Sequence, residues 1–121
     1  MFNFFNKQPA GPQLSMADAI EQVAAGTLIL IDVRDGNEVA QTGKADGAIH
    51  LPLMSFQMKA DPRSPEVMPE LCVDTPVGIY CATGARSGMA VRAMTGMGYK
   101  TVHNLGGLGN WANAGGKIVR A

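Results

Sequence analysis

The chain has 121 residues, enough for one domain with a buried core. Hydrophobic residues make up 46% of it and charged residues 17%, a balance that excludes a disordered polymer and indicates a globular protein. Ten basic residues match ten acidic ones, so the charge gives no reason to expect nucleic acid or an anionic membrane surface as a partner.

The chain shows no sign of membrane insertion or metal binding. No apolar run approaches the roughly 20 residues of a membrane-spanning helix, and the first residues lack the basic leader and apolar block of a secretory signal. We therefore expect a cytoplasmic protein without a membrane partner. The two cysteines, Cys72 and Cys81, should be thiols there, and with two histidines they lack the paired spacing of metal sites, so no metal or other cofactor is expected.

The first third of the chain predicts a tail, a helix and a buried strand. Residues 1–13 are expected to form a flexible tail, and residues 14–121 one domain. Ser15 can cap a helix that ends at Gly26. The run "LILIDV", residues 28–33, is apolar on both faces, as a central parallel strand is.

The remaining elements alternate between helices and strands. In order, they are a short helix capped by Asp35 and Glu38 through about residue 41, a strand over 47–52, broken turns in the proline-rich stretch 54–76, a strand over 76–81, a helix over 87–97 with Met89, Ala90, Ala93, Met94 and Met97 on its core face, a strand over 101–105, and a final turn with Trp111. This alternation predicts an α/β fold, a parallel sheet with helices on both faces.

Cys81 follows a predicted strand and precedes a glycine-containing loop. Ligands bind at the carboxyl ends of the strands in such sheets, where Asp32 also lies. If the loop wraps back, its N–H groups and the next helix N-terminus converge on the sulfur, with Gly84 permitting the turn. This predicts a thiol that ionises below the usual value of about 8.5. The alternative is a buried, inert thiol.

Arg86 falls in the first turn of the predicted helix, where a cation opposes the helix dipole. Either a bound anionic substrate or an ion pair with Asp32 or Glu38 should offset this. Asp32 and Arg34 are candidates for supporting the loop, although an ion pair or loop cap is the commoner role of such a carboxylate. Arg34 and Glu38, four residues apart, are expected to form a structural pair.

Other chemically versatile residues have simpler interpretations. His50 and His103 lie in strand-like segments and are expected to be structural rather than acid–base groups. Cys72 could resolve a modified Cys81 as a disulfide, but an ordinary packed thiol is the favoured interpretation. Trp111 is expected to anchor the core rather than to form a substrate platform.

Four segments, taken in order, resemble the rhodanese family of single-domain sulfurtransferases. They are "IDVRDGNEVAQTG" (31–43), "GAIHLPL" (47–53), "YCATGARSGMAV" (80–91) and "NLGGLGNWANAG" (104–115). The resemblance runs from about residue 14 to 119 and implies a rhodanese-like sheet of roughly five parallel strands. Lys44 and Ala45 stand where the family often has His-Ile, and Lys117 stands where it often has proline.

The resemblance implies that Cys81 is the nucleophile and takes sulfur from a small anionic donor such as thiosulfate. The loop after Cys81 holds the resulting persulfide. Its substrate-binding residues are Ala82, Thr83, Gly84, Ala85, Arg86 and Ser87, and Arg86 contacts the donor. A thiol, cyanide or a sulfur-accepting protein then removes the sulfur. A monomer or weak homodimer is expected.

Three other functions remain open from the sequence. The chain could carry persulfide to a partner protein without turnover, or it could be a sensory binding module. A Cys-based phosphatase or arsenate reductase is less favoured, because the related phosphatase loops follow Cys-x5-Arg. Only four residues separate Cys81 from Arg86 here, which suits a small sulfur atom better than a phosphate.

Overall fold

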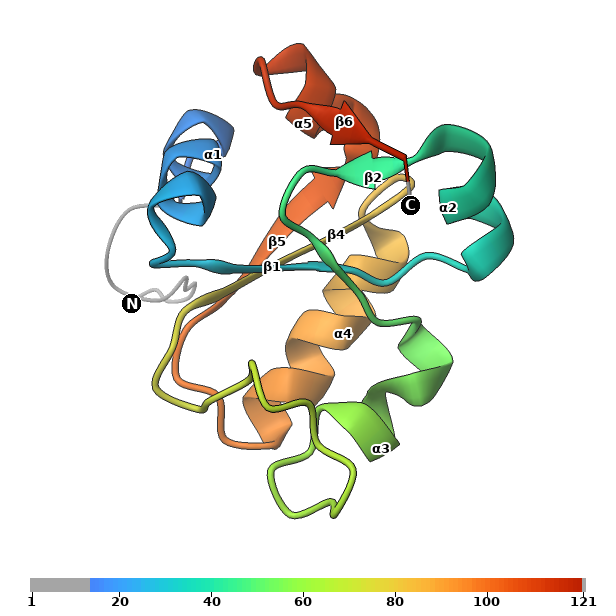
Figure 1. The fold of residues 1–121 in the computed structure, drawn as a ribbon. Helices are drawn as coiled ribbons and strands as arrows, with labels where there is room; N and C mark the ends of the chain where they lie inside the picture. The colour runs from blue at the N-terminus through green and yellow to red at the C-terminus, as the bar shows by residue number, and fades with distance from the viewer. Residues whose placement is uncertain (1–13, 121) are drawn as a thin grey trace, which may run out of the picture.

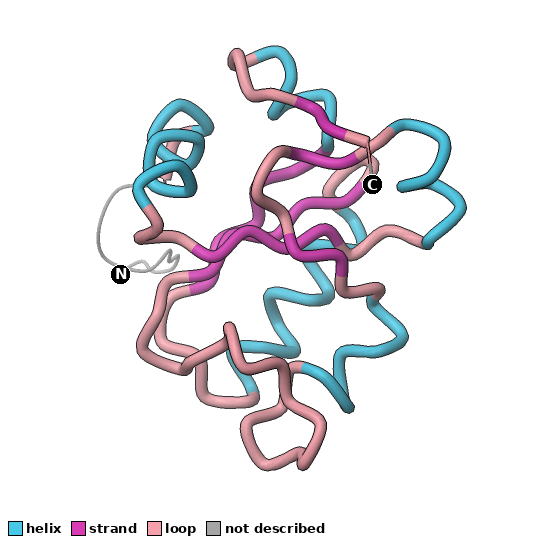
Figure 2. The backbone as a smooth tube through the Cα atoms, in the orientation of Figure 1, coloured by secondary structure: helices cyan, strands magenta, loops and turns pink. Residues whose placement is uncertain are grey.

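The computed structural model describes residues 14–120, and the tail predicted for residues 1–13 lies outside them. Within the described residues, a parallel sheet runs through the middle of the fold (Figures 1 and 2). Its strands, in spatial order, are β3 (Ile49–His50), β1 (Ile29–Asp32), β4 (Val77–Cys81) and β5 (Val102–Gly107).

The predicted α/β class is confirmed, but the strand count differs slightly. Between residues 14 and 120 the parallel sheet has four strands rather than about five. Two further strands, β2 (Lys44–Ala45) and β6 (Ile118–Val119), pair antiparallel with each other in a separate ribbon. Within the described residues, neither of these two strands pairs with the parallel sheet.

Side chains of the central strands alternate between two cores. Ile79 and Cys81 of β4 belong to one buried cluster, and Tyr80 between them belongs to the other. This alternation follows from the two-residue period of a strand. The sheet therefore separates the surroundings of Cys81 from those of its neighbour Tyr80.

Helices cover both faces of the sheet, as predicted (Figure 1). Helices α3 (Phe56–Lys59) and α4 (Ala85–Gly96) pack on the Cys81 side through Phe56, Ala90 and Met94, and Ala60, which follows α3, packs there too. Helices α1 (Met16–Ala25) and α5 (Leu108–Asn113) pack on the Tyr80 side through Ala19 and Trp111. Among residues 14–120, no helix is both long and apolar enough to cross a membrane.

Local signals set the ends of the early helices. The Ser15 hydroxyl accepts a 3.0 Å bond from the Asp18 N–H at the start of α1, and Gly26 ends that helix with φ 80°. Helix α2 (Gly36–Thr42) starts where the Asp35 N–H donates to Glu38 Oε1 over 2.9 Å. Both starts agree with the capping pairs expected from the sequence.

Helix α4 differs from its prediction in two ways. It begins at Ala85, two residues earlier than expected, because Gly84 adopts a left-handed conformation that turns the chain directly into the helix. Met89 was expected in the core but is 52% exposed, while Ala90 and Met94 are buried as expected. The proline-rich stretch contains the short 3-10 turn η1 (Leu53–Ser55) and α3, in line with the predicted broken turns.

Candidate functional site

Cys81 is the last residue of β4, at the carboxyl edge of the sheet, and its side chain is fully buried. The chain then wraps back over the sulfur. The Gly84 N–H donates to Cys81 Sγ over 2.9 Å, and Ser87 Oγ lies 3.4 Å from the same sulfur. The residues over the sulfur, 82–87, are called the Cys81 loop below.

The surroundings of Cys81 favour its ionised form. Burial by itself raises the pKa of the thiol. Hydrogen bonds from the Ser87 side chain and from the backbone of Ser87, Gly84 and Thr83 outweigh burial, and they lower the pKa from 9.0 to about 7. The alternative interpretation of Cys81 as an inert thiol would require the N–H groups of the loop to point away from the sulfur. The sulfur is buried, but these N–H groups point towards it.

Two glycines on β5 allow the loop to sit this close to the sheet. A Cβ on Gly107 would lie 3.0 Å from the Ala82 carbonyl carbon and closer still to its oxygen. Gly107 is the register partner of Cys81, so this contact falls directly beside the sulfur. Gly84 itself has φ 106°, and a Cβ there would meet Gly106 Cα at 3.4 Å. Gly106 and Gly107, which belong to the segment 104–115 that resembles the rhodanese family, therefore leave room for the loop.

Asn104 also belongs to the site, although sequence reasoning did not single it out. Its Nδ2 donates to the Gly84 carbonyl over 3.0 Å, and its Oδ1 accepts from Ser87 Oγ over 2.7 Å. The available signal was position alone, because Asn104 lies on the strand beside β4, in register with Ile79 two residues before Cys81.

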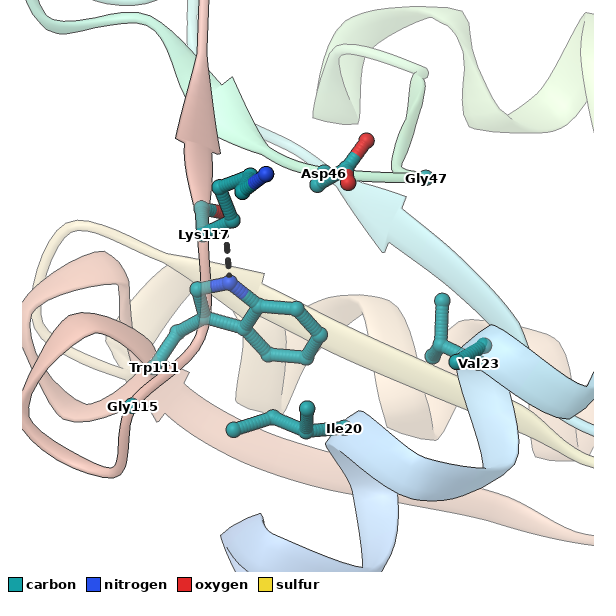
Figure 3. A pocket seen from close by; sticks show the side chains of 8 residues that line it. Ile20, Val23, Asp46, Gly47, Trp111, Gly115 and Lys117 are labelled. Carbon is teal, nitrogen blue, oxygen red and sulfur yellow. Dashed lines mark hydrogen bonds between the residues drawn. The ribbon is translucent and has the colours of Figure 1, made fainter.

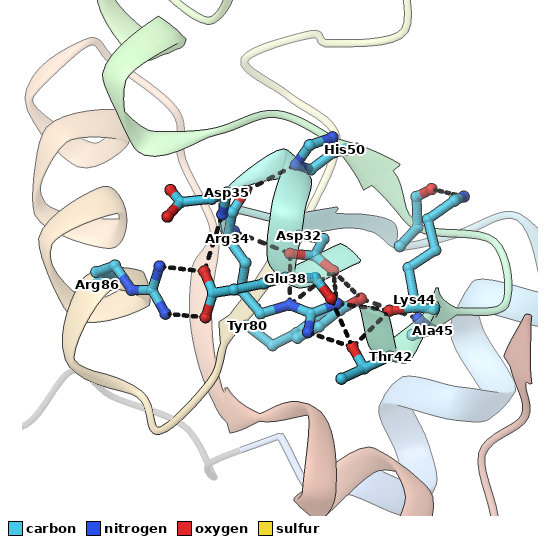
Figure 4. Close-up of polar contacts among 12 residues, drawn as sticks. Asp32, Arg34, Asp35, Glu38, Thr42, Lys44, Ala45, His50, Tyr80 and Arg86 are labelled. Carbon is cyan, nitrogen blue, oxygen red and sulfur yellow. Dashed lines mark hydrogen bonds and ion pairs between the residues drawn. The ribbon is translucent and has the colours of Figure 1, made fainter. Parts of the chain in front are cut away.

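Arg86 forms an ion pair with Glu38, one of the two carboxylates considered for it (Figure 4). Its Nη1 and Nη2 donate to Oε1 and Oε2 over 2.6 and 2.9 Å. The bonds from Arg86, followed by the Asp35 N–H, lower the pKa of Glu38 to about 2, and the pair raises the pKa of Arg86. About a third of each side chain stays exposed, so Arg86 is accessible to solvent, but the carboxylate of Glu38 balances its charge.

Asp32 and Arg34 pair with each other on the opposite side of the sheet from the sulfur. Arg34 Nη2 lies 2.8 Å from Asp32 Oδ2, and the Tyr80 hydroxyl donates to the same carboxylate (Figure 4). Burial, followed by the bond to Asp32, raises the pKa of Tyr80. The predicted Arg34–Glu38 pair is wrong, because Asp32 occupies the guanidinium of Arg34 and Arg86 occupies Glu38.

The guanidinium of Arg34 also fixes the end of α2. Its Nη1 donates to Thr42 Oγ1 over 2.8 Å, and its Nη2 donates to the Gly43 carbonyl over 2.7 Å. None of these partners belongs to the Cys81 loop. Asp32 and Arg34 therefore make the ion pair that was expected as the commoner role, and within the described residues they do not contact the loop.

The other candidate residues lie apart from Cys81. His50 Nε2 donates to the Arg34 carbonyl over 2.7 Å, and burial lowers the pKa of His103. Cys72 is exposed, so the prediction of a packed thiol is wrong. This residue lies in the long connection before β4, where several prolines prevent the chain from forming a helix. Trp111 is 2% exposed and donates from Nε1 to the Lys117 carbonyl over 2.9 Å, in keeping with a core anchor.

A separate hollow of about 370 Å³ lies beside Trp111 (Figure 3). Its walls come from α1, the turn after β2, and the segment from α5 to β6. They comprise Ile20, Val23, Ala24, Asp46, Gly47, Trp111, Gly115 and Lys117. The hollow shares no residue with the Cys81 loop, so it is a distinct feature of the fold.

Comparison with known proteins identifies close relatives of this chain. A relative from Allochromatium vinosum, a sulfurtransferase, is 35% identical over 106 residues that cover 85% of this chain and 91% of the relative. A solved structure from Rhodopseudomonas palustris, described as a protein of unknown function and possible tyrosine phosphatase, is 34% identical with a TM-score of 0.76, and the match covers 88% of this chain and 83% of that one.

A third similarity concerns part of a much longer protein. The thiosulfate sulfurtransferase of Pseudomonas aeruginosa is 28% identical with a TM-score of 0.68, over 88% of this chain and 19% of that one. A model of the family described as rhodanese-like domain matches residues 15–114, which include the Cys81 loop, its Glu38 partner and the glycines of β5. The chain belongs to the rhodanese-like domain family.

Proposed function

We propose that this protein is a sulfurtransferase that moves a sulfur atom from a donor such as thiosulfate to a thiophilic acceptor through a persulfide on Cys81. The observation that carries the proposal is the Gly84 N–H, 2.9 Å from Sγ, within a loop that lowers the pKa of the thiol to about 7. About half of the thiol is then ionised at neutral pH, and no separate general base is needed. The family and the A. vinosum relative support the same chemistry.

The proposed reaction has two displacement steps. The Cys81 thiolate attacks the outer sulfur of thiosulfate, a new S–S bond forms, and sulfite leaves with the electron pair of the bond that breaks. The persulfide then carries the negative charge, which the loop N–H groups can stabilise as they stabilise the thiolate. An acceptor such as cyanide attacks the terminal sulfur and leaves as thiocyanate, which regenerates the Cys81 thiolate.

Arg86 is proposed to meet the anionic donor at the loop. Its guanidinium is one-third exposed, and Ala82, Thr83 and Ala85 are exposed on the loop beside it. The sulfur is covered, so we propose that donors approach across this exposed surface of the loop. Because Glu38 already neutralises Arg86, the donor has to share the guanidinium with that carboxylate.

A mass measurement followed by a turnover assay tests the proposal. Reduced protein is mixed with thiosulfate, intact mass is measured for one added sulfur, and cyanide is then added while thiocyanate is quantified. We expect loading and turnover in the wild type and in Cys72→Ser, and neither in Cys81→Ser. Loading with negligible turnover would favour a carrier that passes sulfur to a partner protein, and no loading of reduced protein would favour a binding module.

A phosphatase remains the second candidate because the R. palustris relative is described as a possible tyrosine phosphatase. The spacing of the loop argues against it, since four residues rather than five separate Cys81 from Arg86. Hydrolysis of an aryl phosphate by the wild type, lost in Cys81→Ser, would replace the sulfurtransferase proposal with this one.

A further inference from the structure

A single side chain on β5 bonds to two residues of the Cys81 loop, Gly84 in its middle and Ser87 at its end. Asn104 Nδ2 donates to the Gly84 carbonyl over 3.0 Å, and Asn104 Oδ1 accepts from Ser87 Oγ over 2.7 Å. The same oxygen accepts from the Gly106 N–H over 3.0 Å, so both ends of the amide are occupied. Asn104 thereby fixes the loop to the neighbouring strand.

Both residues held by Asn104 contact the sulfur. Gly84 donates its N–H to Cys81 Sγ over 2.9 Å, and Ser87 Oγ lies 3.4 Å from Sγ. The contacts of Ser87 and Gly84 are among those that lower the pKa of the thiol. A change at Asn104 should therefore reach the sulfur through two independent routes.

Counting protons shows how the Ser87 hydroxyl can serve both partners. A serine hydroxyl has one proton and can also accept. While Cys81 is a thiol, its S–H can donate to Ser87 Oγ, and Ser87 donates to Asn104 Oδ1. When Cys81 ionises, the Ser87 proton can turn to the sulfur, and Asn104 Oδ1 keeps its bond from the Gly106 N–H. Neither state leaves the asparagine oxygen without a donor.

We propose that Asn104 is a positioning residue for Cys81: its Nδ2 holds the Gly84 N–H against the sulfur, and its Oδ1 accepts the Ser87 proton until the thiol ionises. Its importance for catalysis rests on the proposed sulfur transfer, but its effect on the thiol does not.

Among the described residues, the charged groups near the loop include Arg86 of α4, its partner Glu38 of α2 and Asp35 at the start of α2. Arg92 of α4 also lies close by, since a Cβ on Gly88 would be 4.0 Å from its Nη1 and 3.4 Å from Asn104 Nδ2.

The remaining charges at this edge of the sheet do not compete for the sulfur. On the adjacent strand β1, Asp32 is paired with Arg34 on the far face of the sheet. On β5, His103 directly precedes Asn104, and burial lowers its pKa, which favours the neutral imidazole.

The rate of alkylation by iodoacetamide as a function of pH tests the role of Asn104. All variants carry Cys72→Ser, so that only Cys81 reacts. Asn104→Asp keeps an oxygen to accept from Ser87 and Gly106, but it loses the donor to Gly84, retains the Ser87 proton more strongly and adds a negative charge. Asn104→Ala removes all three bonds. Asn113→Ala, an exposed asparagine on α5, is the matched control.

Asn104→Ala loses the contact to Gly84 but also stops competing for the Ser87 proton, so we expect only a small rise in the midpoint of its alkylation profile. Asn104→Asp should raise the midpoint by about one pH unit. That shift corresponds to an approximately tenfold slower reaction below the midpoint and to equal rates well above it. The control should keep the wild-type profile. In a Ser87→Ala background no serine proton can move to the sulfur, so Asn104→Ala should raise the midpoint more than it does with Ser87 present, through the lost contact to Gly84 alone.

A purely structural role for Asn104 gives a different pattern. In that case, Asn104→Ala in the Ser87→Ala background would lower the melting temperature without moving the midpoint, and the shift caused by Asn104→Asp would disappear at high salt, as expected of its added charge alone. Either result in folded protein overturns the proposal. If the alkylation profiles shift as expected but thiosulfate loads no sulfur, the proposed function fails and the role of Asn104 stands.

Discussion

Replacing Gly107 with alanine should displace the Cys81 loop without straining the backbone. Gly107 has φ −109° and ψ 163°, an extended conformation that alanine adopts freely. The new methyl group would lie 3.0 Å from the Ala82 carbonyl carbon and closer still to its oxygen. Since carbon atoms in contact prefer separations of about 3.5–4.0 Å, the loop has to move by on the order of 1 Å.

The displacement should be measurable in both stability and reactivity. Overpacking of this kind destabilises a fold by about 1–3 kcal/mol. A shift on this scale also weakens the 2.9 Å bond from the Gly84 N–H to Sγ. A hydrogen bond to a charged group contributes about 1.5–3 kcal/mol, so its loss should raise the pKa of the thiol by about one unit. Alkylation of Cys81 at pH 7 should then slow about fivefold and recover at high pH.

Gly109→Ala is the matched control for this experiment. A Cβ at Gly109 meets nothing within 4 Å, and the residue lies in α5, where alanine is about 1 kcal/mol more favourable than glycine. This variant should keep the wild-type alkylation profile and be as stable as the wild type or more so in urea. If Gly107→Ala gave the same profile and stability as Gly109→Ala, the contact between β5 and the loop would not position the thiol.

Three further predictions concern the ionisable groups. Cys81 has a folded pKa of about 7 against an ordinary 9.0, so its stabilising contribution is complete above pH 9 and is lost as the pH falls through 7. The unfolding free energy of the wild type relative to Cys81→Ala should therefore grow by about 2 kcal/mol between pH 7 and 9, and a flat difference in denaturant titrations would contradict the lowered pKa. Glu38→Gln frees Arg86 from a carboxylate that is charged at every working pH, so sulfur loading from thiosulfate should be faster at low salt, with the gain shrinking at high salt; an unchanged rate would argue against Arg86 as the donor contact. Tyr80→Phe removes the hydroxyl bonded to the buried Asp32 and should destabilise the fold by about 1–3 kcal/mol in urea, yet leave the alkylation midpoint of Cys81 unmoved, because the two side chains lie on opposite faces of the sheet.

Much of the local design was predictable from the sequence. The strand before Cys81, the turn at Gly84, the helix that follows and the caps of α1 and α2 all depend on residues within a few positions of one another. Apolar runs, glycines and capping side chains act over that range, which is why these features follow from the sequence pattern. The helix start at Ala85 and the exposed Met89 show the limit, since small residues on several sides of α4 left its buried face ambiguous.

The partners of the charged residues could not be predicted in the same way. Arg34 lies four residues from Glu38, yet it pairs with Asp32, and Glu38 pairs with a residue 48 positions away. An ion pair forms where the fold brings two groups together, and sequence spacing limits only those pairs that lie within one helix. The separation of Asp32 from the Cys81 loop likewise follows from strand alternation combined with the packing of both sheet faces.

The sequence by itself determined the position of the proposed nucleophile and its local surroundings: a cysteine at a strand end, a glycine that turns the chain back, and a helix whose N-terminus follows. Tertiary structure alone decided what completes those surroundings. Asn104 and Gly107 reach the loop because β5 lies parallel to β4 with Gly107 in register with Cys81, although residues 82–101 separate the two strands along the chain. Hydrogen bonds and steric contacts act over a few ångströms in space, so residues distant in sequence enter the site only when the sheet assembles.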